Sequence, residues 1–262
     1  MFEETKYKVE GLDSALYDLC VTPAGGWIGV TESGSRQSLW FNGESVLVPE
    51  PLRFPLVTAI DDETACVVDS RAESNRKNGW IIDRSGSVKN NFFAGDAIQD
   101  IVATEKFFVV TYFDESALGS NGIEGNGVAI FDRHGEFQFG YRELFGTDSV
   151  DIADCYAVCL VAHDRILFSP YTEFPLVSFD LDKQRQEVWA TPGQVSGCHA
   201  ITSIGPTVYF HGPYRDKSGI YKWRIGDDLA ERIGESSHRT RGLANGRFLA
   251  VEKNGFTILS IT

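Results

Sequence analysis

The sequence predicts an all-β fold, a single six-bladed β-propeller that spans residues 1–262 as one domain. Three observations favour this fold. Long helical patterns are nearly absent, one strand-turn-strand unit recurs along the chain, and the two ends carry complementary partial units. Residues that favour strands are frequent, with 18 Phe against 1 Met. Hydrophobic residues make up 42% of the chain, which is enough for a sizeable core.

The recurring unit consists of an apolar strand, a tight polar turn and an alternating strand. Its clearest copies are Gly79–Gly86 and Val128–Glu136. Weaker copies are Leu39–Glu44, Val177–Asp182, Tyr221–Gly226 and the half-copy Phe256–Ser260. Aligned on the turn, the copies recur at intervals of 36 to 49 residues. Four short strands with their turns need roughly 40 to 45 residues, so each repeat predicts one propeller blade.

Two further apolar runs precede each copy, so each blade is expected to contain strands A, B, C and D in chain order. Strand A is innermost in propellers. The predicted A strands are Leu16–Thr22, Leu56–Ile60, Ile98–Thr104, Tyr156–Val161, His199–Ile204 and Gly242–Ala244.

The two ends of the chain indicate how the last blade is completed. The sixth copy stops after its strand C, while Thr5–Val9 precedes the first blade and alternates apolar and charged residues. We expect this segment to supply the missing outer strand, which protects the sheet edge. The alternative fold is a stack of β-sandwiches.

The charge of the chain is strongly negative. Lys and Arg total 24 against 37 Asp and Glu, which gives a net charge of −13. Such a surface repels nucleic acid and anionic lipid, so neither is an expected partner. It attracts a basic protein. Alternatively, the charge only keeps the protein soluble.

Five cysteines, an odd number, lie mostly in apolar runs and are interpreted as buried thiols of a reducing compartment. Cys155 and Cys159 are too far apart on one strand, by roughly 13 Å, to share a zinc ion. The N-terminal residues lack the apolar core of a signal peptide, and no run is long enough to span a membrane. We therefore expect a cytoplasmic protein. We also expect a monomer that needs no cofactor or metal.

Val128–Glu136 resembles the final strands of NHL-type propeller blades, in which an apolar strand ends in Phe-Asp before a Gly turn. The resemblance covers a few residues in two or three blades, so it implies the propeller fold and no specific function. No Trp-Asp strand end, YWTD run or sialidase-type Asp box occurs. The segment Glu10-Gly11-Leu12 lacks the Pro and Trp of the segment that opens metal-dependent lactonase propellers.

One position of each strand A is expected near the mouth of a central channel, by analogy with propellers. The channel-mouth residues are Asp18, Leu56, Asp100, Tyr156, His199 and Arg241, with Asp154, His238 and Arg239 beside them. Carboxylates, His and Arg together could bind a polar ligand, hold a metal or act as acid and base. Alternatively they bridge water and each other.

The connections between strands B and C are the second set of candidates, because long loops on a rigid scaffold often carry recognition. Ser70–Asn78 is long and polar, and Asp114–Asn126 carries Asp114, Glu115 and Glu124. The connection after His211 offers Tyr214 and Arg215, residue types that are enriched at interface hot spots. Alternatively these loops only face solvent.

No catalytic motif such as a nucleophile elbow, P-loop or HExxH run occurs, so no catalytic residue is predicted. The sequence favours a non-enzymatic binding module, for example an immunity-type protein that neutralises a basic toxin. Alternative hypotheses are a metal-dependent hydrolase or lactonase acting in the channel, and a sensor of a small ligand.

Overall fold

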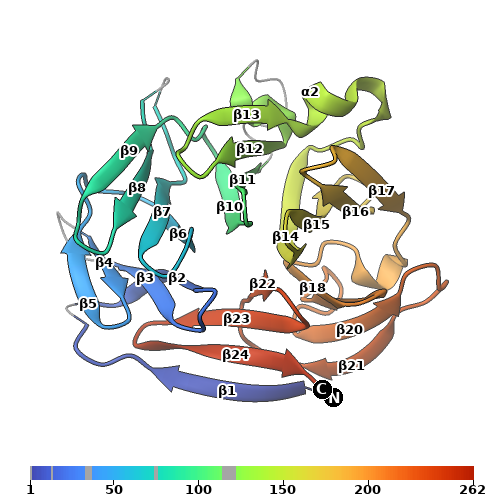
Figure 1. Cartoon of the computed structure of the whole chain (residues 1–262). Helices are drawn as coiled ribbons and strands as arrows, with labels where there is room; N and C mark the ends of the chain where they lie inside the picture. Colours follow the sequence, from blue (N-terminus) through green and yellow to red (C-terminus); the bar gives the residue numbers. More distant parts are fainter. Residues whose placement is uncertain (1, 13, 33–36, 74–75, 114–121) are drawn as a thin grey trace. The chain divides into compact units, whose positions relative to one another are not determined.

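The computed structural model describes residues 2–12, 14–32, 37–73, 76–113 and 122–262. Their strands form six four-stranded sheets with antiparallel neighbours, which are the blades of a six-bladed β-propeller (Figure 1). The predicted fold class is therefore confirmed. The chain contains two compact units, one of Tyr7–Ser149 with Val251–Phe256, the other of Met1–Lys6, Val150–Ala250 and Thr257–Thr262.

Blades 1 to 3 lie in the first unit, and each follows the chain order A, B, C, D. Blade 1 contains β2 (Leu16–Val21), β3 (Trp27–Thr31), β4 (Ser38–Phe41) and β5 (Glu44–Leu47). Blade 2 contains β6 (Pro55–Ala59), β7 (Thr64–Asp69), β8 (Gly79–Asp83) and β9 (Val88–Phe92). Blade 3 contains β10 (Ile98–Ala103), β11 (Phe107–Tyr112), β12 (Val128–Asp132) and β13 (Phe137–Gly140). Three short helices flank blade 3, namely η1 (Ile123–Asn126), α2 (Tyr141–Phe145) and η2 (Gly146–Asp148).

The remaining blades follow the same plan. Blade 4 contains β14 (Asp154–Ala162), β15 (Arg165–Tyr171), β16 (Leu176–Asp180) and β17 (Arg185–Trp189). After η3 (Gly193–Val195), blade 5 contains β18 (Ala200–Ile204), β19 (Thr207–His211), β20 (Gly219–Arg224) and β21 (Glu231–Glu235). Blade 6 contains β22 (Arg241–Leu243), β23 (Arg247–Glu252), β24 (Gly255–Ile261) and β1 (Phe2–Lys8). No helix in these ranges combines the length and the hydropathy that a membrane crossing requires.

The inner strands bury both of their faces, which explains why they read as continuous apolar runs. In β7, Ala65 and Val67 belong to the core shared with blade 1, while Cys66 and Val68 belong to the core shared with blade 3. Successive side chains of a strand point to opposite faces, so the pattern follows from simple alternation. The outer strands carry exposed side chains such as Val88.

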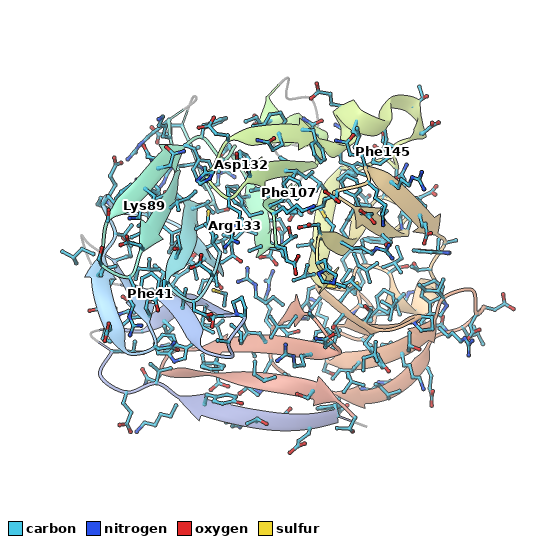
Figure 2. All side chains as sticks on the ribbon, viewed as in Figure 1. Phe41, Lys89, Phe107, Asp132, Arg133 and Phe145 are labelled. Atoms are coloured by element: carbon cyan, nitrogen blue, oxygen red, sulfur yellow. The ribbon has the colours of Figure 1, made fainter. Side chains whose placement is uncertain are left out.

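An aspartate organises the turn between strands C and D that recurs in the sequence. In blade 3 the Asp132 Oδ1 accepts the backbone N–H groups of His134 at 2.8 Å and Glu136 at 3.0 Å. Gly135 has a φ of 87°, which glycine adopts without strain. Arg133 of the same turn reaches blade 2, where it donates to the Ile60 carbonyl at 2.5 Å (Figure 2). The recurring Asp and Gly therefore shape the turn, and in blade 3 this turn carries the arginine that contacts the neighbouring blade.

The same arrangement in blade 2 includes a charged partner. The Asp83 Oδ1 accepts the backbone N–H of Ser85 at 2.9 Å and of Ser87 at 3.0 Å, and Lys89 lies 2.6 Å from its other oxygen. Hydrogen bonds from Lys89 and Ser85 hold the pKa of Asp83 well below its usual range.

The N-terminal strand completes the last blade, as expected. β1 is the outer neighbour of β24, and the Tyr7 ring stacks on Phe256 with centroids 4.6 Å apart. The strand covers Phe2–Lys8 where the sequence predicted Thr5–Val9. Val9 follows the strand, and its backbone N–H donates to the Asn254 carbonyl at 3.0 Å.

Deletion of residues 1–8 should lower the melting temperature by several degrees and cause association, because β24 would lose its partner and become an open edge. Thermal unfolding and size-exclusion chromatography measure both effects. Glu4→Ala, which changes an exposed side chain of β1 and keeps its backbone, is the control. An unchanged melting temperature and a monodisperse truncated protein would contradict the role of β1.

Candidate functional site

Asp18 and Asp100, two of the predicted channel-mouth residues, lie in strands A of blades 1 and 3. The Asp18 Oδ2 accepts the Val57 backbone N–H at 2.8 Å, so this carboxylate joins β2 to β6. The Asp100 Oδ1 accepts the backbone N–H of Ile101 at 2.8 Å. Asp154, Tyr156, His199 and Arg241 belong to the other compact unit, so the set as a whole stays a prediction.

Strand A of blade 4 contains a β-bulge that sequence alignment did not reveal. The register of β14 against β15 shifts between Cys155 and Ala157, which makes Tyr156 the extra residue. Bulges bend a strand and re-aim the side chain they carry. Two residues earlier, Asp154 stands directly opposite Tyr171 on β15.

Blades 1 and 3 have register shifts at the matching place, where Tyr17 and Gln99 are the extra residues. Tyr156 therefore corresponds to Tyr17 and Gln99. The sequence alignment had set it level with Asp18 and Asp100, one position further along the strand.

Four aromatic side chains of blades 4 and 5 pack together, and we call them the aromatic cluster: Tyr156, Tyr171, Phe174 and Tyr214. The Tyr156 centroid lies 5.5 Å from that of Phe174 and 5.7 Å from that of Tyr214. Phe174 is 5.5 Å from Tyr171 and 5.4 Å from Tyr214. Phe174 is buried, whereas Tyr171 is 41% and Tyr214 50% exposed. The cluster therefore has a covered base and two rings open to solvent.

The position of Tyr214 is fixed from three sides. Its ring lies against Gly197, where a Cβ atom would come within 2.5 Å of it. Its backbone N–H donates to the Ser196 carbonyl at 3.0 Å, and its hydroxyl donates to the Tyr156 hydroxyl at 2.5 Å. Tyr214 comes from the connection between β19 and β20, so these contacts join blades 4 and 5.

Phe174 adopts a backbone conformation that is unusual for its residue type. Its φ is 54°, in the left-handed region that bulky side chains avoid. Ring contacts in the aromatic cluster hold its side chain, and its carbonyl accepts the Thr191 hydroxyl at 2.7 Å. Strain of this kind persists only where the surroundings determine the conformation, and it concentrates at functional sites.

The electrostatic surroundings of the aromatic cluster are mixed. Burial of the hydroxyl end, its hydrogen bond with Tyr156 and the nearby Asp154 charge raise the pKa of Tyr214 far above its usual value. Glu173 is exposed in the turn between Tyr171 and Phe174. Arg215, a predicted binding residue, is exposed directly after Tyr214.

A pair of histidines lies between blades 5 and 6. The rings of His199 and His211 are 4.7 Å apart. The buried His211 has its Nδ1 2.8 Å from the Thr240 hydroxyl and its Nε2 3.1 Å from the Ser236 carbonyl. A carbonyl only accepts, so Nε2 carries the proton and Nδ1 accepts from Thr240. The His199 Nε2 in turn accepts the Thr240 backbone N–H at 3.3 Å, so the pair holds the connection that leads to Arg241.

Burial, with the charges of His211 and Arg239 acting in the same direction, lowers the pKa of His199 to about 4. Burial also lowers the pKa of His211, with the charge of His238 acting in the same direction. Both rings are therefore neutral at neutral pH, where they serve as hydrogen-bonding groups.

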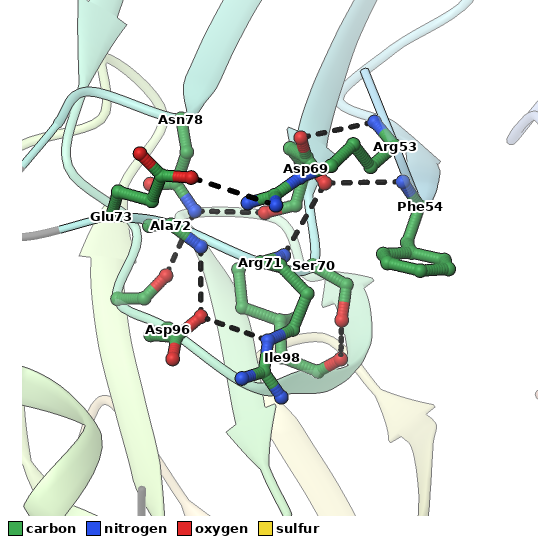
Figure 3. A network of polar contacts seen from close by, with 11 residues as sticks. Arg53, Phe54, Asp69, Ser70, Arg71, Ala72, Glu73, Asn78, Asp96 and Ile98 are labelled. Atoms are coloured by element: carbon green, nitrogen blue, oxygen red, sulfur yellow. Dashed lines mark hydrogen bonds and ion pairs between the residues drawn. The ribbon is translucent and has the colours of Figure 1, made fainter.

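The start of the connection Ser70–Asn78 is anchored by two carboxylates (Figure 3). The buried Asp69 accepts the backbone N–H groups of Arg53 and Phe54, each at 3.1 Å, and of Arg71 at 3.3 Å. Residues 74–75 are outside the described residues.

Asp96 provides the second anchor of this connection. It accepts the Ala72 backbone N–H at 2.8 Å and pairs with the Arg71 Nε at 3.3 Å (Figure 3). The Arg71 guanidinium also lies over the Phe113 ring, 5.6 Å from its centroid. These groups fix the connection to blade 3, which is a structural role.

The predicted connection Asp114–Asn126 is described only in part. Asp114 and Glu115 lie outside the described residues, while Glu124 belongs to η1. Arg142 of α2 donates to the Gly125 carbonyl, so this helix packs against η1. Within the ranges described above, no three His, Cys, Asp or Glu side chains form a group that could hold a metal ion. The five cysteines are buried, and burial raises the pKa of Cys159 and of Cys198 to about 12.

Comparison with solved structures places the chain among propellers. Virginiamycin B lyase from Staphylococcus aureus is similar over 100% of both chains, with 12% identity and a TM-score of 0.59. The WD40 repeats of RRP9 are similar over 98% of this chain and 97% of theirs, with 10% identity and a TM-score of 0.58. A streptogramin B lyase is similar over 100% of this chain and 98% of its own chain, with 9% identity and a TM-score of 0.55. Neither a family model nor a curated protein matches the sequence. At these identities the likeness shows the fold alone.

Sequence reasoning found Tyr156 and Tyr214 but missed Tyr171 and Phe174. The signal was present in the short run Tyr171–Pro175, which connects strands B and C of blade 4. Such a short connection is not a candidate where long loops are expected to carry recognition.

The histidine pair predicts a dependence of stability on pH. Both rings have a folded pKa below the unfolded value of about 6.5, so the stability they contribute is present above that pH and is lost as the pH falls, for His199 toward about pH 4. The melting temperature should fall over this interval, and it should fall less steeply in His199→Gln. His134→Gln, at an exposed turn position, is the control. Equal slopes in the wild type and His199→Gln would refute the assignment.

Proposed function

We propose that this chain is a protein-binding β-propeller that captures a basic protein through the aromatic cluster and the connections around it. The observation that supports this proposal is the pair of half-exposed tyrosines, Tyr171 and Tyr214, on a base of packed rings. Tyrosine is enriched at the centres of protein interfaces, where it buries a large area at a low cost in side-chain entropy.

The scaffold around these rings suits recognition. Tyr171 ends strand B of blade 4, Tyr214 lies on the connection between strands B and C of blade 5, and backbone hydrogen bonds hold this connection. Rigid scaffolds that present short loops carry many binding sites. Because the rings are already packed against each other, little order has to be imposed on binding.

The charge of the chain supports a basic partner. A net charge of −13 accelerates the approach of a positively charged protein, and this acceleration weakens as salt increases. Within the proposal, the partner is a basic toxin whose active site is occluded when the complex forms. The chain resembles immunity-type inhibitors in its small size and acidity.

A lyase and a WD40-type propeller both share the fold with this chain at 12% identity or less, so the shared fold favours neither function. An activity in a channel, such as that of a metal-dependent hydrolase or lactonase, is the alternative hypothesis. The exposed aromatic cluster favours binding, because its rings offer contact area and no acid, base or nucleophile of matched pKa.

The proposal predicts that Tyr171→Ala with Tyr214→Ala abolishes partner capture. Wild type, this double variant and Leu229→Ala would be used as immobilised baits, and each captured protein would then be purified and titrated at low and high salt. Leu229 is 70% exposed and lies at the opposite end of β20 from Tyr214, so it is a matched control. We expect a basic protein that binds wild type and the control alike, about tenfold or more weakly in the double variant, and more weakly at high salt.

Equal capture by all three baits would overturn the proposal, as would binding that ignores salt. Circular dichroism melting curves of the three proteins exclude loss of fold as the cause.

A further inference from the structure

The aromatic cluster has the chemistry of a site for a cationic side chain. Building on the proposed function, we infer that a lysine or arginine of the partner docks there, with its charged group on the open rings of Tyr171 and Tyr214 and beside Asp154. The inference concerns the anchor of the complex, while the proposed function concerns the complex itself.

The two open rings supply the first part of this chemistry. The faces of aromatic rings are electron-rich and attract ammonium and guanidinium groups. Tyr171 and Tyr214 are 41% and 50% exposed, and both contact the buried Phe174 on their inner sides. Their outer surfaces are therefore available while their inner surfaces are fixed.

Asp154 supplies the second part. It stands directly opposite Tyr171 in the β14–β15 register, and facing residues of adjacent antiparallel strands have Cβ atoms about 4.5 to 5.5 Å apart. After burial and the hydrogen bond with Tyr156, the Asp154 charge is a further cause of the raised pKa of Tyr214 in the next blade. Glu173 adds a second carboxylate in the turn that joins Tyr171 to Phe174. A cation at the rings gains from both carboxylates, whereas an anion is repelled.

Two cations of the chain oppose this preference and make it testable. Arg215 and Lys217 are exposed on the connection that carries Tyr214. If the site takes a cation, removal of the Arg215 charge should leave binding unchanged or strengthen it. If the site takes a carboxylate, the same change should weaken binding.

The site is organised before any ligand arrives. Phe174 is held in the left-handed region, Tyr214 lies on Gly197, and the Tyr214 hydroxyl bonds that of Tyr156. Groups held in place lose little freedom on binding, so even a small cation should bind measurably.

The experiment uses the full-length protein and four small probes. Nα-acetyl-arginine amide and Nα-acetyl-lysine amide carry the charge. Their neutral counterparts are Nα-acetyl-citrulline amide and the lysine amide that is acetylated at both its α-amino and its side-chain nitrogen. Calorimetric titration gives the affinity of each probe, and tyrosine ring signals in NMR spectra report where it binds. We expect each cation to bind at least about fivefold more tightly than its neutral counterpart.

The variants separate the rings from the charge. Tyr171→Ala and Tyr214→Ala should each remove the preference for the cation, whereas Tyr171→Phe and Tyr214→Phe should retain it because they keep the rings. Asp154→Asn should weaken cation binding severalfold and leave the neutral probes unaffected. Leu229→Ala should match the wild type, and Arg215→Ala should bind the cations at least as tightly.

Equal affinity for charged and neutral probes would overturn the inference and indicate simple stacking. Cation binding that survives in Tyr171→Ala with Tyr214→Ala would also overturn it, since the site would lie elsewhere. If the partner is captured but the cations show no preference, the anchor is wrong and the proposed function stands. If the cations bind as expected and no protein is captured, the proposed function fails and the site stands.

Discussion

The whole structure depends on the need of each four-stranded sheet to cover two apolar faces. No blade can do this alone, because an isolated sheet has no neighbouring layer that would cover either of its faces. Blade 2 shows the solution, with alternate residues of β7 in two different cores, one shared with each neighbouring blade. Blades 4 and 5 share a further core that includes Leu167, Phe210 and Trp223.

This constraint determines which parts of the chain are free to carry function. Strands B and C are committed to the cores between blades, and the outer strand of blade 6 is committed to its edge. The connections between strands remain, and they are positioned by the blades on either side. The aromatic cluster uses this freedom, since its four rings come from two strand ends and two short connections of blades 4 and 5.

The fold was predictable because its determinants are local and repeated. The turn aspartates Asp83 and Asp132 each accept two backbone N–H groups, so the same residue type recurs at the same place in blades 2 and 3. The role of β1 was predictable as well, because the N-terminal segment alternates like a strand and the sixth repeat lacks its outer strand. Its boundaries differ by one to three residues from the expected ones, a shift that propensity alone does not determine.

The candidate site was predictable only in part, because its determinants are not local. The strands A of blades 1, 3 and 4 each carry a bulge that no sequence signal marks, so the alignment set Tyr156 level with Asp18 and Asp100 when it corresponds to Tyr17 and Gln99. The left-handed backbone of Phe174 contradicts the preference of its residue type, so it had to be observed. Tyr214 could be selected by residue type, yet its support by Gly197 and Tyr156 depends on packing between blades.

The combination of a strained residue and open rings at one place argues that these two features are connected. The bulge recurs in blades 1 and 3 and so belongs to the fold, whereas the left-handed conformation of the buried Phe174 costs stability. Together they turn Tyr156 and Phe174 into the base on which Tyr171 and Tyr214 stand, beside the carboxylate of Asp154. A surface that holds a cation gains rings, charge and rigidity from this arrangement.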